Sequence, residues 1–413
     1  MRVCIVGAGM QGAVAASVLA RDPERPQIVL CDADLERAER IAAHIGGRRV
    51  ATARIDATDV ASLVAAMEGC DVVLNVVFFE MAAAVRRAAL EAGCHYVDSA
   101  ADSAFLNTLA FERRVVDDEA FKAAGLCAIA ACGWAPGVSN VLARRAADRL
   151  DEVAELHVRI GLDRSLWVDP EAVAHAFRPH ASPEVILLDY AEQSLHFTSG
   201  RPVRVPPFAL AETYDFGGRI GTLVLTSHDH DESYTLPACV GKGITECTFR
   251  YPLNDQAATL VAMGMGDPER VVELRDGTRV KPFDVVMALV DRPADQTLLR
   301  EGRAGLAATR DADRAVVVEA TGRKDGAARS VRLTWYVRDC AELRLRLFEA
   351  YGSAQVWVAL PMVVAARIAI RGDVPAGVTL PEQLDPERFL GGLQSMGYPL
   401  EILEHDAGEL GPE

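Results

Sequence analysis

Three glycines near the N-terminus have the spacing of a loop that holds a phosphate. They belong to a run between a short β-branched segment and an Ala-rich helical stretch, Gly7-Ala8-Gly9-Met10-Gln11-Gly12. In such a turn the first glycine bends the chain, the second lets the backbone approach a pyrophosphate, and the third lets the helix pack on the strand. The helix N-terminus adds free N–H groups and a positive dipole end. The run predicts a dinucleotide site, the alternative being an unrelated strand-to-helix turn.

Further cofactor contacts are expected at the ends of the following strands. Asp32 lies twenty residues beyond Gly12, where a carboxylate can accept hydrogen bonds from both hydroxyls of an adenosine ribose and repels a 2′-phosphate. No arginine immediately follows it, so the sequence favours NAD over NADP. Asp56 is a candidate for the adenine border, and Asn75 with Val76 for the nicotinamide-side ribose. Asp56 and Asn75 could equally cap the helices that follow them.

The first third of the chain alternates short β-branched runs with helical stretches, which is typical of a parallel sheet covered by helices. Six strands are expected, at Val3–Val6, Gln27–Asp32, Val50–Ile55, Val72–Val77, His95–Asp98 and Leu126–Ala131. We therefore predict an α/β protein whose residues 1–135 form a doubly wound Rossmann domain that binds the dinucleotide.

Beyond Asn140 the pattern changes to strand-like runs separated by glycine turns and longer loops. The expected strands are Glu155–Gly161, Ser194–Phe197, Thr222–Thr226, Ile244–Tyr251, Ala315–Thr321 and Arg329–Arg338. The last two, joined by a glycine-containing turn, predict an antiparallel hairpin. Residues 136–355 are thus expected to form an α/β domain for substrate binding and dimerisation, with a mostly antiparallel sheet.

Residues 356–413 are predicted to be a helical segment that packs back near the domain junction. An apolar helix is expected at Val356–Arg371 and a final helix near Pro386–Met396, and the acidic tail after Glu401 looks loosely held. The apolar run contains Pro361 and Arg367 and is too short to span a bilayer.

Composition narrows the possible partners. Acidic residues outnumber basic ones by 59 to 43, the net charge is -16, and no compact Lys/Arg block is present. Nucleic acids and anionic membranes would be repelled. The nine cysteines are irregularly spaced and form no C-x-x-C pair, which favours reduced thiols in the cytoplasm and gives no support for a metal site.

Two motifs beyond the fifth and sixth strands, and two further downstream, resemble the saccharopine dehydrogenase family. They are Gly93/Tyr96/Asp98, Gly133/Pro136/Gly137/Asn140, the segment from His230 to Pro237, and Gly377-Val378 with Pro381-Glu382. The chain departs from the family pattern at His180-Ala181, at Ser233 and at Val358-Ala359-Leu360-Pro361. The resemblance covers nearly the whole chain, and the departures concern substrate choice.

The resemblance implies NAD(P)-dependent hydride transfer at a C–N centre of an amino acid or imine-linked amino acid related to lysine, saccharopine or polyamines. Such chemistry needs a group that moves a proton. Asp98 is one candidate, and His230 with Glu232 is the other, while Tyr96 could hydrogen-bond the substrate. The bland alternatives are a capping aspartate and a surface histidine.

An amino-acid substrate also needs a cation for its carboxylate. Arg178 and Lys242 lie in suitable segments, and Asn140 of the P-G-x-x-N motif is a further substrate-binding candidate. Trp134 could stack near the nicotinamide or pack at the domain junction.

The competing hypothesis is a catalytically silent, dinucleotide-responsive binding protein with the same fold, because the departures at His180-Ala181 and Val358-Ala359 could have removed turnover. An open sheet in the second domain would expose an edge, so we also expect a homodimer. The partner expected on either hypothesis is a small molecule.

Overall fold

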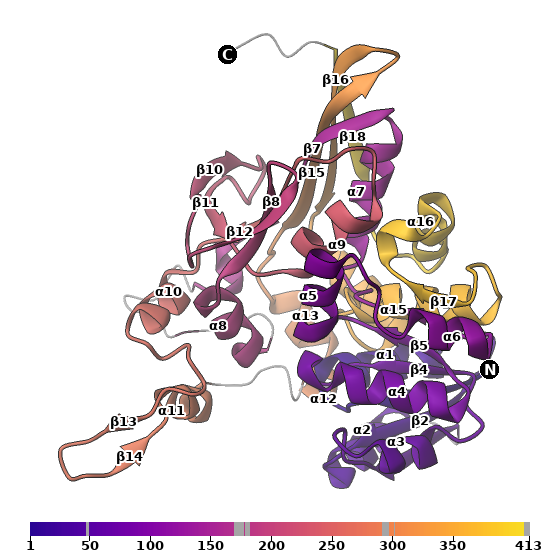
Figure 1. The fold of residues 1–413 in the computed structure, drawn as a ribbon. Helices are drawn as coiled ribbons and strands as arrows, with labels where there is room; N and C mark the ends of the chain where they lie inside the picture. The colour runs from indigo at the N-terminus through magenta and orange to yellow at the C-terminus, as the bar shows by residue number, and fades with distance from the viewer. Residues whose placement is uncertain (47–48, 169–176, 178–181, 291–296, 301, 409–413) are drawn as a thin grey trace.

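Two β-sheets, one parallel and one mostly antiparallel, organise the chain (Figure 1). The computed structural model describes residues 1–46, 49–168, 177, 182–290, 297–300 and 302–408. Figure 1 shows the parallel sheet and its helices around the N-terminus, with the second sheet extending away from them. The predicted fold class is confirmed.

The first sheet has seven parallel strands in the order β17-β6-β5-β4-β1-β2-β3. The strands are β1 (Arg2–Val6), β2 (Gln27–Asp32), β3 (Val50–Arg54), β4 (Val72–Asn75), β5 (His95–Asp98), β6 (Cys127–Ile129) and β17 (Gly377–Thr379). The order reverses direction between β1 and β4, where Val6 pairs with Asn75. Ligands of doubly wound sheets bind at the carboxyl ends of the strands at such a switch point.

Alternate residues of these strands pack into two separate cores, one on each face of the sheet. Val3 and Ile5 belong to a core with α1 (Met10–Ala20) and α15 (Ala359–Ile370). Cys4 and Val6 belong to the other core. That second core is completed by α3 (Val60–Met67), α4 (Ala82–Ala92), α5 (Ser103–Glu112) and α6 (Asp118–Ala124). Burial on both faces explains the continuous apolar character of the strands.

The second sheet has nine strands, seven of them in the order β10-β11-β12-β7-β15-β16-β18. They are β7 (Glu152–Leu162), β8 (Ser194–Thr198), β9 (Arg201–Val205), β10 (Glu212–Asp215), β11 (Thr222–Ser227), β12 (Glu246–Pro252), β15 (Arg314–Lys324), β16 (Ala327–Val337) and β18 (Ile402–Gly408). Only β12 and β7 pair in parallel among the described strands of this sheet. The predicted hairpin is β15–β16, and α7 (Val138–Asp148) packs against β7, β15 and β16.

Shorter elements fill the spaces around the two sheets. They are α2 (Leu35–Ile45), η1 (Phe79–Met81), η2 (Arg164–Leu166), α8 (Pro183–Ala191), α9 (Asp231–Cys239), α10 (Asp255–Ala262), β13 (Val272–Glu273), β14 (Arg279–Val280), α11 (Pro282–Leu289), α12 (Thr297–Arg300), α13 (Arg303–Ala308), α14 (Ala341–Tyr351), η4 (Pro381–Gln383) and α16 (Pro386–Ser395). No helix in the described part of the chain has the length and apolarity that a membrane crossing needs.

The C-terminal segment differs from the predicted helical segment. Besides α15 and α16 it contributes β17 to the first sheet and β18 to the second. The prediction of a loosely held tail after Glu401 is wrong for Ile402–Gly408, because these residues form β18 and pair with β16. Arg145 of α7 and Arg149, which directly follows this helix, form ion pairs with Glu404, which neutralises part of the tail's negative charge.

Candidate functional site

The glycine turn after β1 has the geometry that its motif requires. Gly7 has a φ of +106°. A Cβ on Gly12 would lie 1.8 Å from the carbonyl oxygen of Gly7, so only glycine lets α1 start this close to the strand. A Cβ on Gly9 would meet no described atom within 4 Å. Space in front of Gly9 is what a pyrophosphate needs to approach the backbone.

Asp32 lies beside this turn at the end of β2. Its Oδ2 accepts a hydrogen bond from the backbone N–H of Ala8 at 2.7 Å, and its Oδ1 accepts one from Asp34 at 2.9 Å. The Arg37 guanidinium approaches Oδ2 to 4.0 Å. The carboxylate is therefore fixed next to the predicted pyrophosphate site.

The candidates on the next strands make local contacts. Asp56 is exposed and accepts hydrogen bonds from the backbone and hydroxyl of Thr58, which lower its pKa. Asn75 is 2% exposed and donates to the Tyr96 hydroxyl at 3.0 Å. Val76 packs against Gly12. Asp56 thus has the contacts of a turn residue, and Asn75 and Val76 have those of core residues.

Tyr96 and Asp98 form a buried pair on β5. The Tyr96 hydroxyl donates to Asp98 Oδ2 at 2.8 Å, and the backbone N–H of Ala131 donates to Asp98 Oδ1. Burial raises the pKa of Asp98 to about 7 despite these hydrogen bonds. Neither residue lines the cavity described next.

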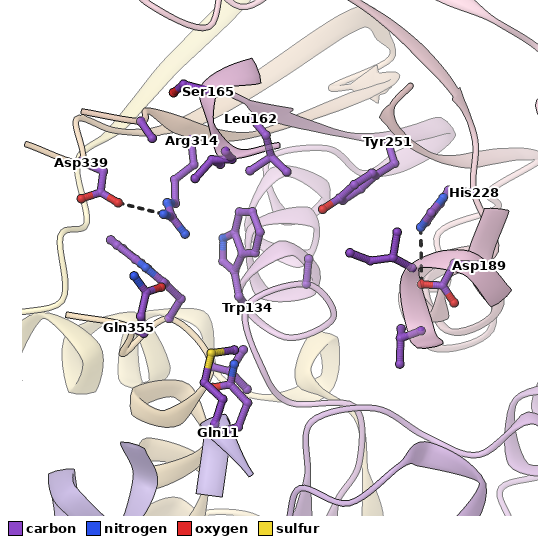
Figure 2. A pocket seen from close by; sticks show the side chains of 18 of the residues that line it. Gln11, Trp134, Leu162, Ser165, Asp189, His228, Tyr251, Arg314, Asp339 and Gln355 are labelled. Atoms are coloured by element: carbon purple, nitrogen blue, oxygen red, sulfur yellow. Dashed lines mark hydrogen bonds and ion pairs between the residues drawn. The ribbon is translucent and has the colours of Figure 1, made fainter. Parts of the chain in front are cut away.

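A cavity of about 610 Å³ lies between the N-terminus of α1 and the second sheet (Figure 2). Met10 and Gln11 border it on the side of the Rossmann domain. The other walls come from the loop after β6, η2, α8, the loop between β11 and α9, β12, and the segments around β15 and α14. The polar and aromatic residues of these walls include Trp134, Ser165, Asp189, His228, His230, Tyr251, Arg310, Arg314, Asp339, Arg344 and Trp357. The cavity thus adjoins the predicted cofactor turn.

Several cavity-lining side chains carry buried polar atoms that have no partner among the described residues. They are Gln11 Oε1, Trp134 Nε1, Ser165 Oγ, His228 Nδ1, Arg314 Nε and Trp357 Nε1. Leaving one such atom unpaired costs about 1–3 kcal/mol. A cavity with this lining is suited to a polar ligand that supplies the missing hydrogen bonds.

His230 is the predicted acid–base candidate that lines the cavity. Its Nδ1 donates to Glu232, whose other carboxylate oxygen accepts from the Ser139 hydroxyl. Burial lowers the pKa of His230, but the Glu232 carboxylate outweighs it and the pKa rises to about 9. The ring stacks on Phe249, with the centroids 4.1 Å apart. At neutral pH this residue is an imidazolium held in one orientation.

Asn140 lies behind the cavity wall and joins three elements. Its Oδ1 accepts from the backbone N–H of Gly137, and its Nδ2 donates to Thr235 and Glu382, both at 3.1 Å. It is fully buried and does not line the cavity. The contacts connect α7, α9 and η4.

The two predicted cations have different outcomes. Lys242 does not line the cavity, and its ammonium donates to the carbonyls of Ala147 and Leu150, each at 2.8 Å. It therefore caps the C-terminal end of α7. Arg178 lies outside the described residues, as does His180. Among the residues that the structure describes, no group of His, Cys, Asp and Glu is arranged to hold a metal ion.

Sequence reasoning missed most of the cavity's charged lining. The sequence does not single out Asp189, Arg314 or Asp339. For Trp134 it leaves two roles open, stacking near the nicotinamide and packing at the domain junction. Trp134 both lines the cavity and packs on Trp335, with a centroid distance of 6.1 Å. The sequence could have indicated Arg314 as a site residue, because this arginine directly precedes the apolar run that is predicted to be a strand.

Comparison with known proteins agrees with the motif assignment. Residues 3–129 match the family model described as saccharopine dehydrogenase NADP binding domain. The chain is 26% identical to carboxyaminopropylagmatine dehydrogenase of Synechocystis sp., over 96% of both proteins. It is also 26% identical to carboxynorspermidine synthase of Vibrio cholerae, over 99% of this chain and 98% of the relative.

Two solved structures share the fold over almost the whole chain. Saccharopine dehydrogenase (L-Glu forming) from Saccharomyces cerevisiae has a TM-score of 0.66 at 14% identity and covers 98% of this chain and 100% of its own. Homospermidine synthase from Legionella pneumophila, in complex with NAD, has a TM-score of 0.65 at 13% identity and covers 100% and 94%. The resemblance to the saccharopine dehydrogenase family that the motifs predict is confirmed by the family model over residues 3–129, and the two solved structures show that the fold is shared over almost the whole chain.

Proposed function

We propose that this protein is an NAD-dependent oxidoreductase that transfers a hydride at a C–N centre of a polyamine-related, carboxylate-bearing substrate. The observation that carries the proposal is the position of the cavity. It adjoins Met10 and Gln11 of the dinucleotide motif and has a protonated histidine, His230, in its wall. The two curated relatives are named for a dehydrogenase and a synthase of carboxylated polyamine-type amines.

The residues at the switch point fit a dinucleotide. Gly9 leaves room for the pyrophosphate, the positive dipole end of α1 would face it, and Asp32 is fixed where the ribose hydroxyls are expected. We propose NAD rather than NADP because the Asp32 carboxylate would repel a 2′-phosphate. An arginine near this position can bind a 2′-phosphate, and Arg37 approaches Asp32, so both dinucleotides are measured in the test below.

The bound nicotinamide would supply or accept the hydride at the substrate carbon. The chain itself manages the proton. In the reductive direction the imine nitrogen must gain a proton as the carbon gains the hydride, and His230 holds one at neutral pH. Glu232 keeps the imidazolium charged and oriented. In the oxidative direction the same ring, when neutral, accepts the proton that the amine releases.

The first test is calorimetric titration of the purified protein with NAD and, separately, with NADP. We expect NAD to bind more tightly, and the Asp32→Ala variant to bind it about tenfold or more weakly, since two charge-assisted hydrogen bonds are lost. Binding of neither dinucleotide would contradict the proposal. Preference for NADP would correct the cofactor and leave the reaction type standing.

Turnover separates the enzyme from a silent binding protein of the same fold. We expect the absorbance of the reduced nicotinamide to change when carboxynorspermidine or a related secondary amine is added with NAD. The His230→Gln variant should bind NAD normally and turn over at least about a hundredfold more slowly. Tight cofactor binding without turnover of any amine or imine would favour the silent protein.

We further propose a homodimer that works in the cytoplasm. All nine cysteines are free, which fits a reducing compartment. The edge strand β18 exposes Leu403, a side chain that a second subunit could cover.

A further inference from the structure

We propose that the cavity has an anion-binding end at Arg314 and a cation-binding end at Asp189, so that it selects a ligand with a carboxylate at one end and an ammonium or guanidinium group at the other. This assignment rests on the proposed function and names the residues that would select its substrate. Figure 2 shows Arg314 and Asp339 on one side of Trp134, with Tyr251, His228 and Asp189 on the other. A ligand that touches both ends must pass the indole.

The anion-binding end is built around a held guanidinium. Arg314 is 7% exposed, and its Nη2 donates to Asp339 Oδ2 at 2.8 Å. Its guanidinium carbon lies 4.3 Å from the ring centroid of Trp357. These contacts fix the plane of the group, while Nε stays buried without a partner among the described residues. A preorganised guanidinium with a free edge is suited to a carboxylate.

Two buried guanidinium groups, Arg314 and Arg344, lie at this end. Asp339 also receives Arg344, whose Nη1 lies 3.2 Å from its Oδ1, so two guanidinium groups share one carboxylate. Arg344 reaches a second carboxylate, Asp311, at 3.2 Å, but that side chain is 42% exposed and its charge is screened by water. Arg310 also lines the cavity.

The cation-binding end combines a carboxylate with aromatic faces. Asp189 Oδ2 lies 3.4 Å from His228 Nε2. His228 stacks on Tyr251 with centroids 4.7 Å apart and meets the edge of Tyr190 at 4.7 Å. When Nε2 carries the proton that faces Asp189, the unpartnered Nδ1 of His228 is a hydrogen-bond acceptor. Carboxylates and aromatic faces together attract ammonium and guanidinium groups.

Further carboxyl groups lie near Asp189. Burial raises the pKa of Glu192, and the carboxylates of Asp229 and Asp189 raise it further, which reflects several acids close together. The nearby imidazolium of His230 is matched by Glu232. Arg204 is the cation that opposes this group of acids, and it also contacts Tyr234 and the backbone of Gln193. The cavity therefore presents a buried guanidinium, Arg314, at one end and a carboxylate, Asp189, at the other.

The test is calorimetry with three ligands in the presence of saturating NADH, the reduced cofactor, which cannot accept a hydride from an amine. Carboxynorspermidine has both charged ends, norspermidine lacks the carboxylate, and an analogue of carboxynorspermidine with methyl in place of the terminal amine lacks the distal cation. We expect the first to bind the wild-type protein about tenfold or more tightly than either of the others. Equal affinity for all three would overturn the assignment.

Two variants assign each end to its residue. Asp189→Asn should lose about tenfold or more in affinity for carboxynorspermidine and none for the methyl analogue. Arg314→Gln should lose a similar factor for carboxynorspermidine and none for norspermidine, and Arg314→Lys should recover part of it. The exposed Asp284→Asn serves as control and should bind all three ligands as the wild type does.

Outcomes for the ends and for the reaction can be told apart, because binding is measured without turnover. If the ligand preferences follow the variants but no protein oxidises any ligand, the assignment of the ends stands and the proposed reaction fails. If turnover occurs and both variants weaken all ligands equally, the assignment fails alone. NAD affinity and thermal melting of each variant show that it is folded.

Discussion

His230 carries a charge in a place where burial alone would remove it. The ring is held between Phe249 and the carboxylate of Glu232, and this carboxylate contributes most to stabilising the imidazolium there. The acidity of the proposed proton donor is therefore set by a neighbour that is itself fully buried. Changing that neighbour changes the chemistry without touching the histidine.

Replacing Glu232 by glutamine should lower the pKa of His230 from about 9, because the carboxylate that contributes most against burial is lost and only Asp231 and Asp189 still raise it. An NMR titration of the imidazole protons between pH 5 and 10 measures this. His196 is an internal control, since burial holds its pKa at about 4 and its signals should stay constant. An unchanged His230 titration in Glu232→Gln would refute this account.

The same pair makes a defined contribution to stability. The folded pKa of His230 lies above the ordinary value of about 6.5. Its stabilisation is fully present below that value and is lost as pH rises through about 9. The difference in free energy of unfolding between wild type and Glu232→Gln should therefore shrink over this interval, as urea titrations at several pH values would show.

Gly9 and Gly12 offer a matched pair for the cofactor turn. Gly12→Ala should destabilise the protein by roughly 1–3 kcal/mol or more, because its Cβ overlaps the Gly7 carbonyl. Gly9→Ala should change stability by less than about 0.5 kcal/mol and yet weaken NAD binding, because its Cβ occupies only the space kept for the pyrophosphate. Melting curves and calorimetry measure the two effects. Normal NAD binding by Gly9→Ala would contradict the placement of the pyrophosphate.

Individual site residues could be predicted from sequence where they lie close together in a motif. Gln11 and His230, found in this way, both line the cavity. Arg314 and Asp339 are 25 residues apart and meet only because β15 and β16 form a hairpin. The sequence around Arg314 and Asp339 does not indicate that these two side chains form an ion pair.

At the scale of elements, the asparagine of the P-G-x-x-N motif holds three helices together. Asn140 connects the start of α7 to α9 and to η4, which follows the last strand of the first sheet. The motif therefore fixes how helices from distant parts of the chain meet. His230 directly precedes α9, so this junction also holds the proposed proton donor in place.

Asn140→Ala should lower the free energy of unfolding by roughly 1–3 kcal/mol for each buried group left without a partner. Denaturant titration measures the loss. Asn107→Ala, at a partly exposed position on α5, is the control and should cost less. Full stability combined with loss of substrate binding would instead support the direct substrate contact predicted for Asn140.

The strands were predictable in proportion to their apolar pattern. β2 and β5 begin and end at the predicted residues, since each is a buried run bounded by polar ones. β17 and β18 were missed for different reasons. The three residues of β17 follow a Pro/Gly-rich loop, and the acidic residues of β18 pair with Arg149, which follows α7. Neither strand is recognisable without its neighbours.

In the whole molecule, the cavity brings the proposed cofactor turn next to the proposed substrate-binding walls, which come from segments far from the turn in the sequence. The homodimer remains a prediction at this scale. Sedimentation equilibrium should give the mass of two chains, because an open edge such as β18 with Leu403 exposed is a site that a second copy can cover. A mass of 44.4 kDa, that of one chain, would rule the dimer out.

The position of β17 also affects how the protein is made. The nucleotide-binding sheet pairs β17 with β6, although about 250 residues separate them in the chain. During translation the ribosome therefore releases six of the seven strands long before the last one. Until then β6 is an unpaired edge, and the sheet face that α15 later covers is open to chaperones or to other nascent chains. A stop codon shortly before Gly377 would leave β6 as an unpaired edge in the final product.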